Sequence, residues 1–150
     1  MDNETILQKE IDLIQNCINR MANNSFMLKG WSISLIAVVL ALTNDRLNAL
    51  FLLCSVCIPL LCFWYLDAFF LRTERMYRKM YDWVLKERKN NNFEFKYDLN
   101  SKRFEKDVDS TFKIMFSKTL RVFYGVPTLL VLSIILCEIK SAICHCFFKI

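Results

Sequence analysis

The cysteines and the one histidine are the residues of this sequence best suited to metal binding or redox chemistry. Cys54 and Cys57, two of seven cysteines, have the C-x-x-C spacing of redox and zinc sites. They lie in a long apolar run, where a thiol resists the ionisation that either chemistry needs. Cys144, His145 and Cys146 are adjacent, so they point in different directions on a helix, and no second ligand pair lies nearby. We therefore expect apolar packing residues here, with no metal site and no cofactor.

Catalytic sites are a second kind of chemical site that residue patterns in a sequence can reveal. The sequence contains no Ser-His-Asp set and no HExxH, GxSxG or P-loop pattern. Its carboxylates between residues 72 and 121 are spread as on a solvated helix surface. We expect a protein that is not an enzyme and has no catalytic residues.

One carboxylate, Asp67, lies inside the aromatic stretch from Phe63 to Arg72. A charge near hydrocarbon is costly unless it is paired or faces a protein interior, so Asp67 needs a partner. Arg72, Arg75 and Lys29 are the candidates. An ion pair that pins two helices together is the plain interpretation, and a role in an ion path or proton relay is the alternative.

Two apolar runs, residues 26–43 and 47–71, must position Asp67. Only a short polar break at residues 44–46 separates them, and 55% of the 150 residues are hydrophobic. A bilayer core needs about 20 mostly apolar residues per crossing, and a helix satisfies its own backbone groups there. The runs predict an all-α membrane protein built on a transmembrane helical hairpin. The alternative is a soluble bundle with a very apolar central hairpin.

A third crossing is predicted at residues 122–140, because Val122 to Cys137 contains sixteen residues without a charge. Gly125 and Pro127 predict an irregular start. The alternative is a re-entrant or interfacial segment. In the second run, Pro59 predicts a kink about one turn before itself, which serves either packing or a gating hinge.

Charge placement orients this single membrane domain. Residues 72–121 carry fourteen Lys or Arg against eight Asp or Glu. Since Lys and Arg accumulate on the cytoplasmic side, this insert and the N-terminus are expected in the cytoplasm and the C-terminus outside, and Trp31 is expected at the headgroup level.

The remaining elements are an amphipathic helix at 4–24, a cytoplasmic helix at 72–88, a short β-strand at 93–99 and a helix at 109–121. The strand rests on the alternation of Phe93, Phe95 and Tyr97 with charged residues, and Asp109 with Ser110 can cap the last helix. Stacking of nucleotide bases on these aromatics is an alternative use, although no glycine-rich phosphate cradle accompanies them. We expect no binding to nucleic acid.

The order of elements over residues 5–88, with NSFMLKGW at the entry to the first crossing and FWYLDAFFLRTERMYR at the exit of the second, resembles SLATT-type and other small two-transmembrane effectors of bacterial antiphage defence. The resemblance implies a homo-oligomer in the bacterial inner membrane that disrupts the bilayer when a regulatory protein or nucleotide signal triggers it. A membrane anchor that recruits a soluble protein is the alternative.

Two groups of residues are expected to carry that function. The hairpin and its movement would depend on Asp67, Arg72, Pro59, Trp31 and Trp64. Contacts to a regulator, ligand or neighbouring protomer would use Phe93, Phe95, Tyr97, Arg75, Arg78 and Lys79.

Overall fold

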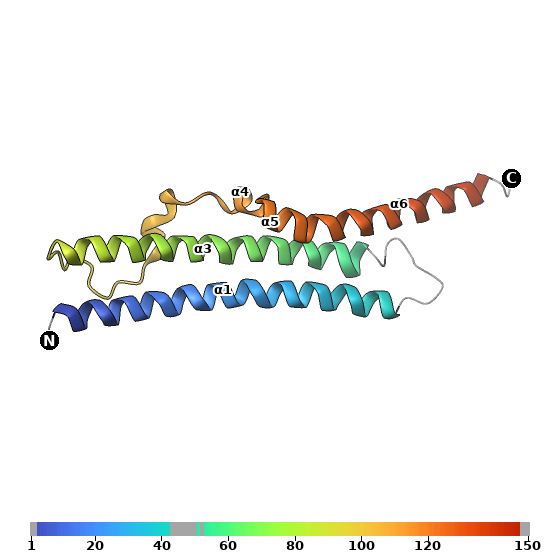
Figure 1. The fold of residues 1–150 in the computed structure, drawn as a ribbon. Coiled ribbons are helices and arrows are strands. Elements are labelled where there is room, and N and C mark those ends of the chain that lie inside the picture. Colours follow the sequence, from blue (N-terminus) through green and yellow to red (C-terminus); the bar gives the residue numbers. More distant parts are fainter. Residues whose placement is uncertain (1–2, 43–50, 52, 148–150) are drawn as a thin grey trace.

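Two long antiparallel helices form the body of the molecule in the computed structural model (Figure 1). The structure describes residues 3–42, 51 and 53–147, without the side chains of residues 40, 42, 138 and 141–147. Helix α1 (Asn3–Leu42) has 40 residues, and α3 (Ile58–Lys89) has 32. At about 1.5 Å per residue these helices are roughly 60 and 48 Å long. The predicted helical fold and the antiparallel pairing are confirmed, whereas the turn at 44–46 and the start of the second run at 47–50 lie outside the described residues.

Helix α1 combines two stretches that the sequence separates. Its first half has the predicted apolar seam, of which Ile14 is buried and Leu7 and Ile18 are partly buried. The predicted amphipathic helix at 4–24 and the crossing expected from residue 26 are therefore one continuous helix. Ser25, between the two, is buried.

Where a kink was predicted before Pro59, the structure has a π-helical turn. This turn, η1 (Leu53–Cys57), precedes α3, and Pro59 lies in the first turn of that helix. Because Pro59 has no backbone N–H, a carbonyl about one turn before it loses its helical hydrogen bond, which accounts for an irregular turn at this place.

After α3 the chain returns along the helix pair through four short elements between Ser101 and Gly125, which together we call the returning segment. These are a 3₁₀ segment η2 (Ser101–Asp107), α4 (Thr111–Met115), α5 (Lys118–Leu120) and a π-helical turn η3 (Arg121–Gly125). The last helix is α6 (Val126–Phe147). Ser110 caps α4 by accepting a hydrogen bond from the backbone N–H of Lys113, as predicted. The single helix expected at 109–121 is divided in two, because the chain turns at Phe116 and Ser117.

No strand is present within the described residues, and the strand predicted at 93–99 is not formed. Residues 94–97 form a turn in which Phe95 and Tyr97 have positive φ values of 56° and 60°. Those values belong to the left-handed region and exclude an extended strand.

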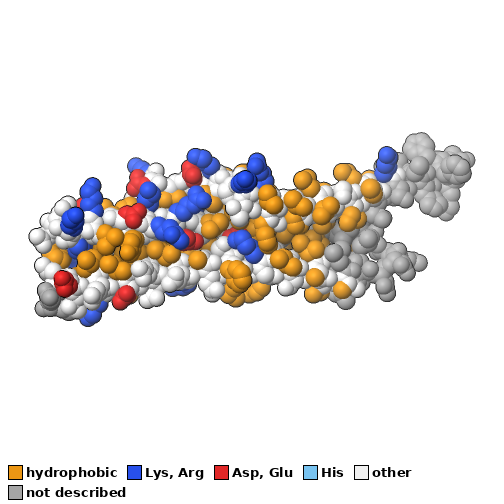
Figure 2. Space-filling model, viewed as in Figure 1, with side chains coloured by type: hydrophobic (Ala, Val, Ile, Leu, Met, Phe, Trp, Pro, Cys, Tyr) orange, Lys and Arg blue, Asp and Glu red, His pale blue; other side chains and the backbone are white. Residues whose placement is uncertain are grey.

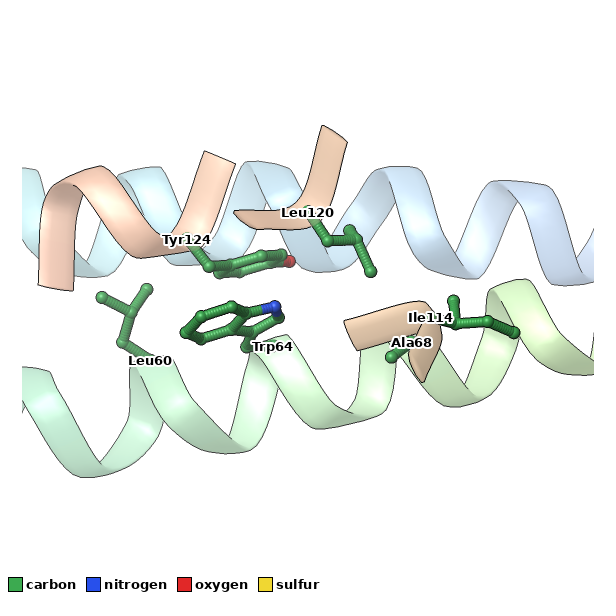
Figure 3. Close-up of a cluster of buried hydrophobic side chains, with 6 residues drawn as sticks. All are labelled: Leu60, Trp64, Ala68, Ile114, Leu120 and Tyr124. Carbon is green, nitrogen blue, oxygen red and sulfur yellow. The ribbon is translucent and has the colours of Figure 1, made fainter. Parts of the chain in front are cut away.

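Three apolar clusters hold the elements together. The first joins α1, η1 and α6 through Val39, Val56, Cys57, Val131 and Ile135. The second joins α3 to the returning segment through Leu60, Trp64, Ala68, Ile114, Leu120 and Tyr124 (Figure 3). The third joins the N-terminal half of α1 to the far end of α3 and to η2 through Ile14, Met80, Val84 and Phe104. The returning segment is therefore packed along most of α3.

The surface divides into a charged half and an apolar half (Figure 2). On the face that Figure 2 shows, Lys, Arg, Asp and Glu are concentrated in the half near the N-terminus, with hydrophobic patches between them, whereas hydrophobic side chains predominate in the half near the described end of α1 and along most of α6. Two helical stretches, Leu53–Lys89 and Lys118–Cys137, are long and apolar enough to cross a membrane. Large apolar side chains remain exposed on the apolar half, among them Phe26, Ile33, Val38, Ile58, Leu61, Leu129 and Leu136.

Candidate functional site

A fully buried carboxylate, Asp67, lies where the charged and apolar halves meet. Its partner is Lys29 of α1, whose Nζ is 2.6 Å from Asp67 Oδ2. The hydroxyl of Ser25 donates to Asp67 Oδ1, and the hydroxyl of Tyr124 donates to Oδ2 at 3.1 Å. Lys29 also donates to Ser25 Oγ at 2.8 Å. Of the candidate partners, the structure thus pairs Asp67 with Lys29, and it adds two hydroxyls. We call these four residues the Asp67 cluster.

Three elements supply the Asp67 cluster. Ser25 and Lys29 are four residues apart on α1, so both face α3, and Tyr124 lies on η3 at the start of the last apolar stretch. Ser32, one turn beyond Lys29, is also buried and donates to the Lys29 carbonyl. Because the carboxylate and the ammonium neutralise each other, the cluster places no net charge beside the apolar half. No buried side-chain N or O atom among the described residues lacks a hydrogen-bond partner.

Trp64 supports the Asp67 cluster from one turn away on α3. Its ring stacks on the ring of Tyr124 (Figure 3). The two centroids are 6.2 Å apart and the planes differ by 14°. Its Nε1 donates to the Met115 carbonyl at 2.8 Å. Trp64 therefore connects α3 both to the last apolar stretch and to α4.

The other predicted hairpin residues lie outside this cluster. Arg72 points to the returning segment, where it pairs with Glu105 at 3.1 Å and donates to the Asp109 carbonyl at 3.2 Å. Trp31 is exposed and lines a mostly apolar hollow of about 290 Å³ between α1 and α3. Pro59 is two turns away from Asp67, at the start of α3.

A second buried ion pair, which the sequence did not reveal, closes the other end of the helix pair. Arg88 near the end of α3 meets Glu10 of α1 in two contacts, Nε to Oε2 at 2.7 Å and Nη2 to Oε1 at 2.8 Å. The backbone N–H of Tyr97 donates to Glu10 Oε1 at 2.8 Å, and Arg88 donates to the Asn92 carbonyl. Burial alone would raise the pKa of Glu10, but the hydrogen bonds from Arg88 and Tyr97 hold the pKa below its ordinary value.

The aromatic residues predicted to contact a partner are used within the chain. The guanidinium of Arg103 lies 3.9 Å from the ring centroid of Phe95 and 4.5 Å from that of Trp83. Arg88 lies 5.3 Å from the Phe93 ring, and Lys96 lies 5.3 Å from the Tyr97 ring. These cation–π contacts stabilise the turn where the sequence suggested a strand.

The predicted basic residues Arg75, Arg78 and Lys79 do come together. With Asp107, Val108 and Asp109 they line an open cavity of about 330 Å³. The Asp109 carboxylate pairs with Lys113 and lies 3.8 Å from Arg75. These two cations hold the pKa of Asp109 below its ordinary value, and Lys113 has the larger effect. A phosphate or carboxylate entering the cavity would meet two arginines that already have acidic partners, Arg75 with Asp109 and Arg78 with Glu74.

The residues that sequence reasoning missed are Ser25, Tyr124, Glu10, Arg88 and Arg103. The apolar sequence around Tyr124 did not indicate that its hydroxyl donates to Asp67, which is 57 residues away in the sequence. For Glu10 a signal existed, since it lies four residues before the buried Ile14 of the amphipathic seam. The side chains of Cys144, His145 and Cys146 lie outside the described residues.

Over the described residues, the fold and the site define a mainly helical protein with two helical stretches long and apolar enough to span a membrane and with two buried ion pairs between its long helices. Comparisons with models of protein families, with curated proteins and with solved structures gave no match.

Proposed function

We propose that this chain is a membrane effector that lies in the bacterial inner membrane, with its apolar half in the bilayer and its charged half in the cytoplasm. The exposed apolar side chains of α1, α3 and α6 would otherwise face water over a continuous surface. Soluble monomers rarely expose apolar patches larger than a few hundred Å². In a bilayer the same surface is stabilising.

This placement gives three crossings, which use the second half of α1, the first half of α3 with η1, and the stretch that begins at Lys118. Basic residues of α3 and of the returning segment then lie on the cytoplasmic side, together with the N-terminus. The free end of α6 leads to the opposite side, where α1 also ends (Figure 1).

The observation that carries the effector proposal is the Asp67 cluster. It ties all three crossings together at the cytoplasmic edge of the apolar half, and Trp64 ties the same point to α4. A force on the cytoplasmic segment would therefore act directly on the packing of the crossings. We propose that a trigger, either a regulatory protein or a nucleotide signal, shifts this packing in an oligomer and permeabilises the bilayer as part of an abortive-infection response to phage.

The test is membrane potential and entry of an impermeant dye in bacteria that express the chain. Wild type should depolarise the cells, either on expression or once phage infection supplies the trigger, and Asp67→Asn should not in either condition, because it leaves Lys29 without its counter-ion inside the protein. The matched control is Asp82→Asn, which removes an exposed carboxylate from the same helix and should leave depolarisation unchanged. Membrane fractions must contain equal amounts of each protein.

An intact membrane potential with wild type in the membrane, in phage-infected and uninfected cells, would contradict the effector proposal. The second candidate, an anchor that recruits a soluble protein, would then be favoured by the open basic cavity at Arg75, Arg78 and Lys79. An anchor predicts that Arg75→Glu with Arg78→Glu abolishes co-purification of a soluble protein without any change in membrane potential.

A further inference from the structure

We infer that α4 is an interfacial anchor: its aromatic face inserts into the cytoplasmic leaflet of the bilayer, and the lysines beside it bind the anionic headgroups. This inference rests on the membrane placement proposed above and adds a lipid-binding surface to it. The surface consists of Phe112 and Phe116 of the returning segment with Tyr65 and Phe69 of α3, and we call it the aromatic face.

The aromatic face is exposed although it is strongly apolar. Phe112 is 67% exposed and Phe116 is 58% exposed, and Tyr65 and Phe69 are exposed beside them. The ring centroids of Phe112 and Tyr65 are 6.2 Å apart, so the two elements present one continuous surface. In water this arrangement would leave several large rings solvated without any gain from burial.

The contacts of α4 fix its depth. Just before it, the Asp109 carbonyl accepts a hydrogen bond from Arg72, on the charged half. Just after it, the Phe116 ring lies 5.6 Å from the Trp64 ring, on the apolar side of Asp67. The segment from 109 to 116 therefore descends across the boundary between the two halves. This boundary is the depth at which aromatic side chains concentrate in membrane proteins.

Charge selects the lipid. Lys113 is 72% exposed, and Lys118 and Arg121 are exposed as well, all within the same short stretch. Asp109, which pairs with Lys113, lies at the end of α4 farther from the apolar half. Long basic side chains can extend from this depth to headgroup phosphates while the rings lie below. The occupant that fits both features is the surface of an anionic bilayer.

The test uses the full chain reconstituted in vesicles of phosphatidylglycerol and brominated phosphatidylcholine. The bromine is placed on the acyl chain, either near the headgroup or near the chain end, and it quenches the fluorescence of tryptophan that lies close to it. A tryptophan is added by Phe112→Trp, and its emission is taken as the difference from wild type. Leu129→Trp, on an exposed position of α6, is the control within the membrane, and Leu85→Trp, on the charged half of α3, is the control outside it.

Phe112→Trp should be quenched at least twofold by bromine near the headgroup and less by bromine near the chain end. Leu129→Trp should be quenched more by the deep bromine, and Leu85→Trp by neither. Replacing Lys113 and Lys118 by Gln should weaken the shallow quenching of Phe112→Trp, and so should removal of phosphatidylglycerol.

An unquenched Phe112→Trp beside a quenched Leu129→Trp would overturn the inference, because it would mean that the aromatic face does not contact lipid. Equal quenching with and without phosphatidylglycerol would overturn the selection of anionic lipid. Neither outcome depends on depolarisation, so failure of this inference is distinct from failure of the effector proposal. If Leu129→Trp is also unquenched, the membrane placement itself is wrong and this inference falls with it.

Discussion

Removing Arg88 should detach the N-terminal half of α1 from α3. Arg88 forms a buried ion pair with Glu10 of α1, and the two side chains are only 2% and 4% exposed, respectively. Arg88→Met therefore leaves the Glu10 carboxylate inside the protein without its cation. Breaking a buried pair in this way costs about 3–5 kcal/mol. Full burial of an isoleucine is worth about 1.5–3 kcal/mol, so the loss is comparable to the combined contribution of Ile6 and Ile14, two buried apolar residues of this half of α1.

Hydrogen exchange measured by mass spectrometry on the reconstituted chain gives the readout. A free-energy loss of this size corresponds to exchange that is faster by a factor between about 10² and 10⁴ for residues 3–18, since each 1.4 kcal/mol is about tenfold. Residues 58–70, which pack on a different cluster, should be unaffected. Lys89→Met, which removes the neighbouring exposed charge, is the matched control and should change nothing.

Acid should weaken the same contact. The pKa of Glu10 lies below its ordinary value in the folded protein, so the pair contributes stability that is complete above about pH 4.3 and is lost as pH falls through the lower, folded-state pKa. After correction for the intrinsic effect of pH on exchange, protection of residues 3–18 should decrease there in wild type but not in a Glu10→Leu, Arg88→Met double variant. Unchanged protection in Arg88→Met at neutral pH would refute the reasoning, because it would mean that the pair adds nothing to the packing of α1.

Three further substitutions test individual contacts. Tyr124→Phe removes a hydrogen bond to the Asp67 carboxylate and should cost about 1.5–3 kcal/mol, seen as a lower melting temperature in detergent. Trp64→Phe removes the donor to the Met115 carbonyl, and a loss of about 0.5–1.5 kcal/mol should appear with faster exchange of α4 amides, whereas α1 keeps its protection. Arg103→Lys keeps the charge but loses the planar guanidinium, which should cost about 0.5–2 kcal/mol and shift the fluorescence emission of the indole that it covers.

The helical plan was readable from the sequence because long apolar or amphipathic periods with almost no Gly or Pro leave little choice of backbone. Three local features could also be located from the sequence. A kink was predicted before Pro59 and an irregular start near Gly125, and the structure has a π-helical turn at each place; the cap at Ser110 is formed as predicted. Each depends on a proline, a glycine or a serine side chain within one turn. That is the range over which a sequence pattern acts directly.

The strand at 93–99 could not be distinguished from a turn by its alternation. Phe93 and Phe95 do alternate with charged residues, but their rings are covered by Arg88 and Arg103 from other elements. An isolated strand would need a partner that the chain does not offer, whereas a turn lets each ring contact a guanidinium. Here tertiary contacts decided what local propensity left open.

Asp67 shows the same limit within the site. Its burial and its need for a cation were predictable from its apolar surroundings, and Lys29 was among the candidates. The contributions of Ser25 and Tyr124 were not, because each depends on the relative positions of helices that only packing sets.

The two buried pairs together determine the register of α1 against α3. Glu10 and Lys29 are nineteen residues apart on α1, and Asp67 and Arg88 are twenty-one apart on α3, which correspond to about 28 and 32 Å along a helix. The charges are reversed at the two ends, with the carboxylate on α1 at one pair and on α3 at the other. A slip of one helical turn, about 5.4 Å, would break both pairs at once, although an apolar seam alone tolerates such a shift. Movement between the charged half and the apolar half would therefore require separation of the helices at one pair or movement of the returning segment, rather than sliding.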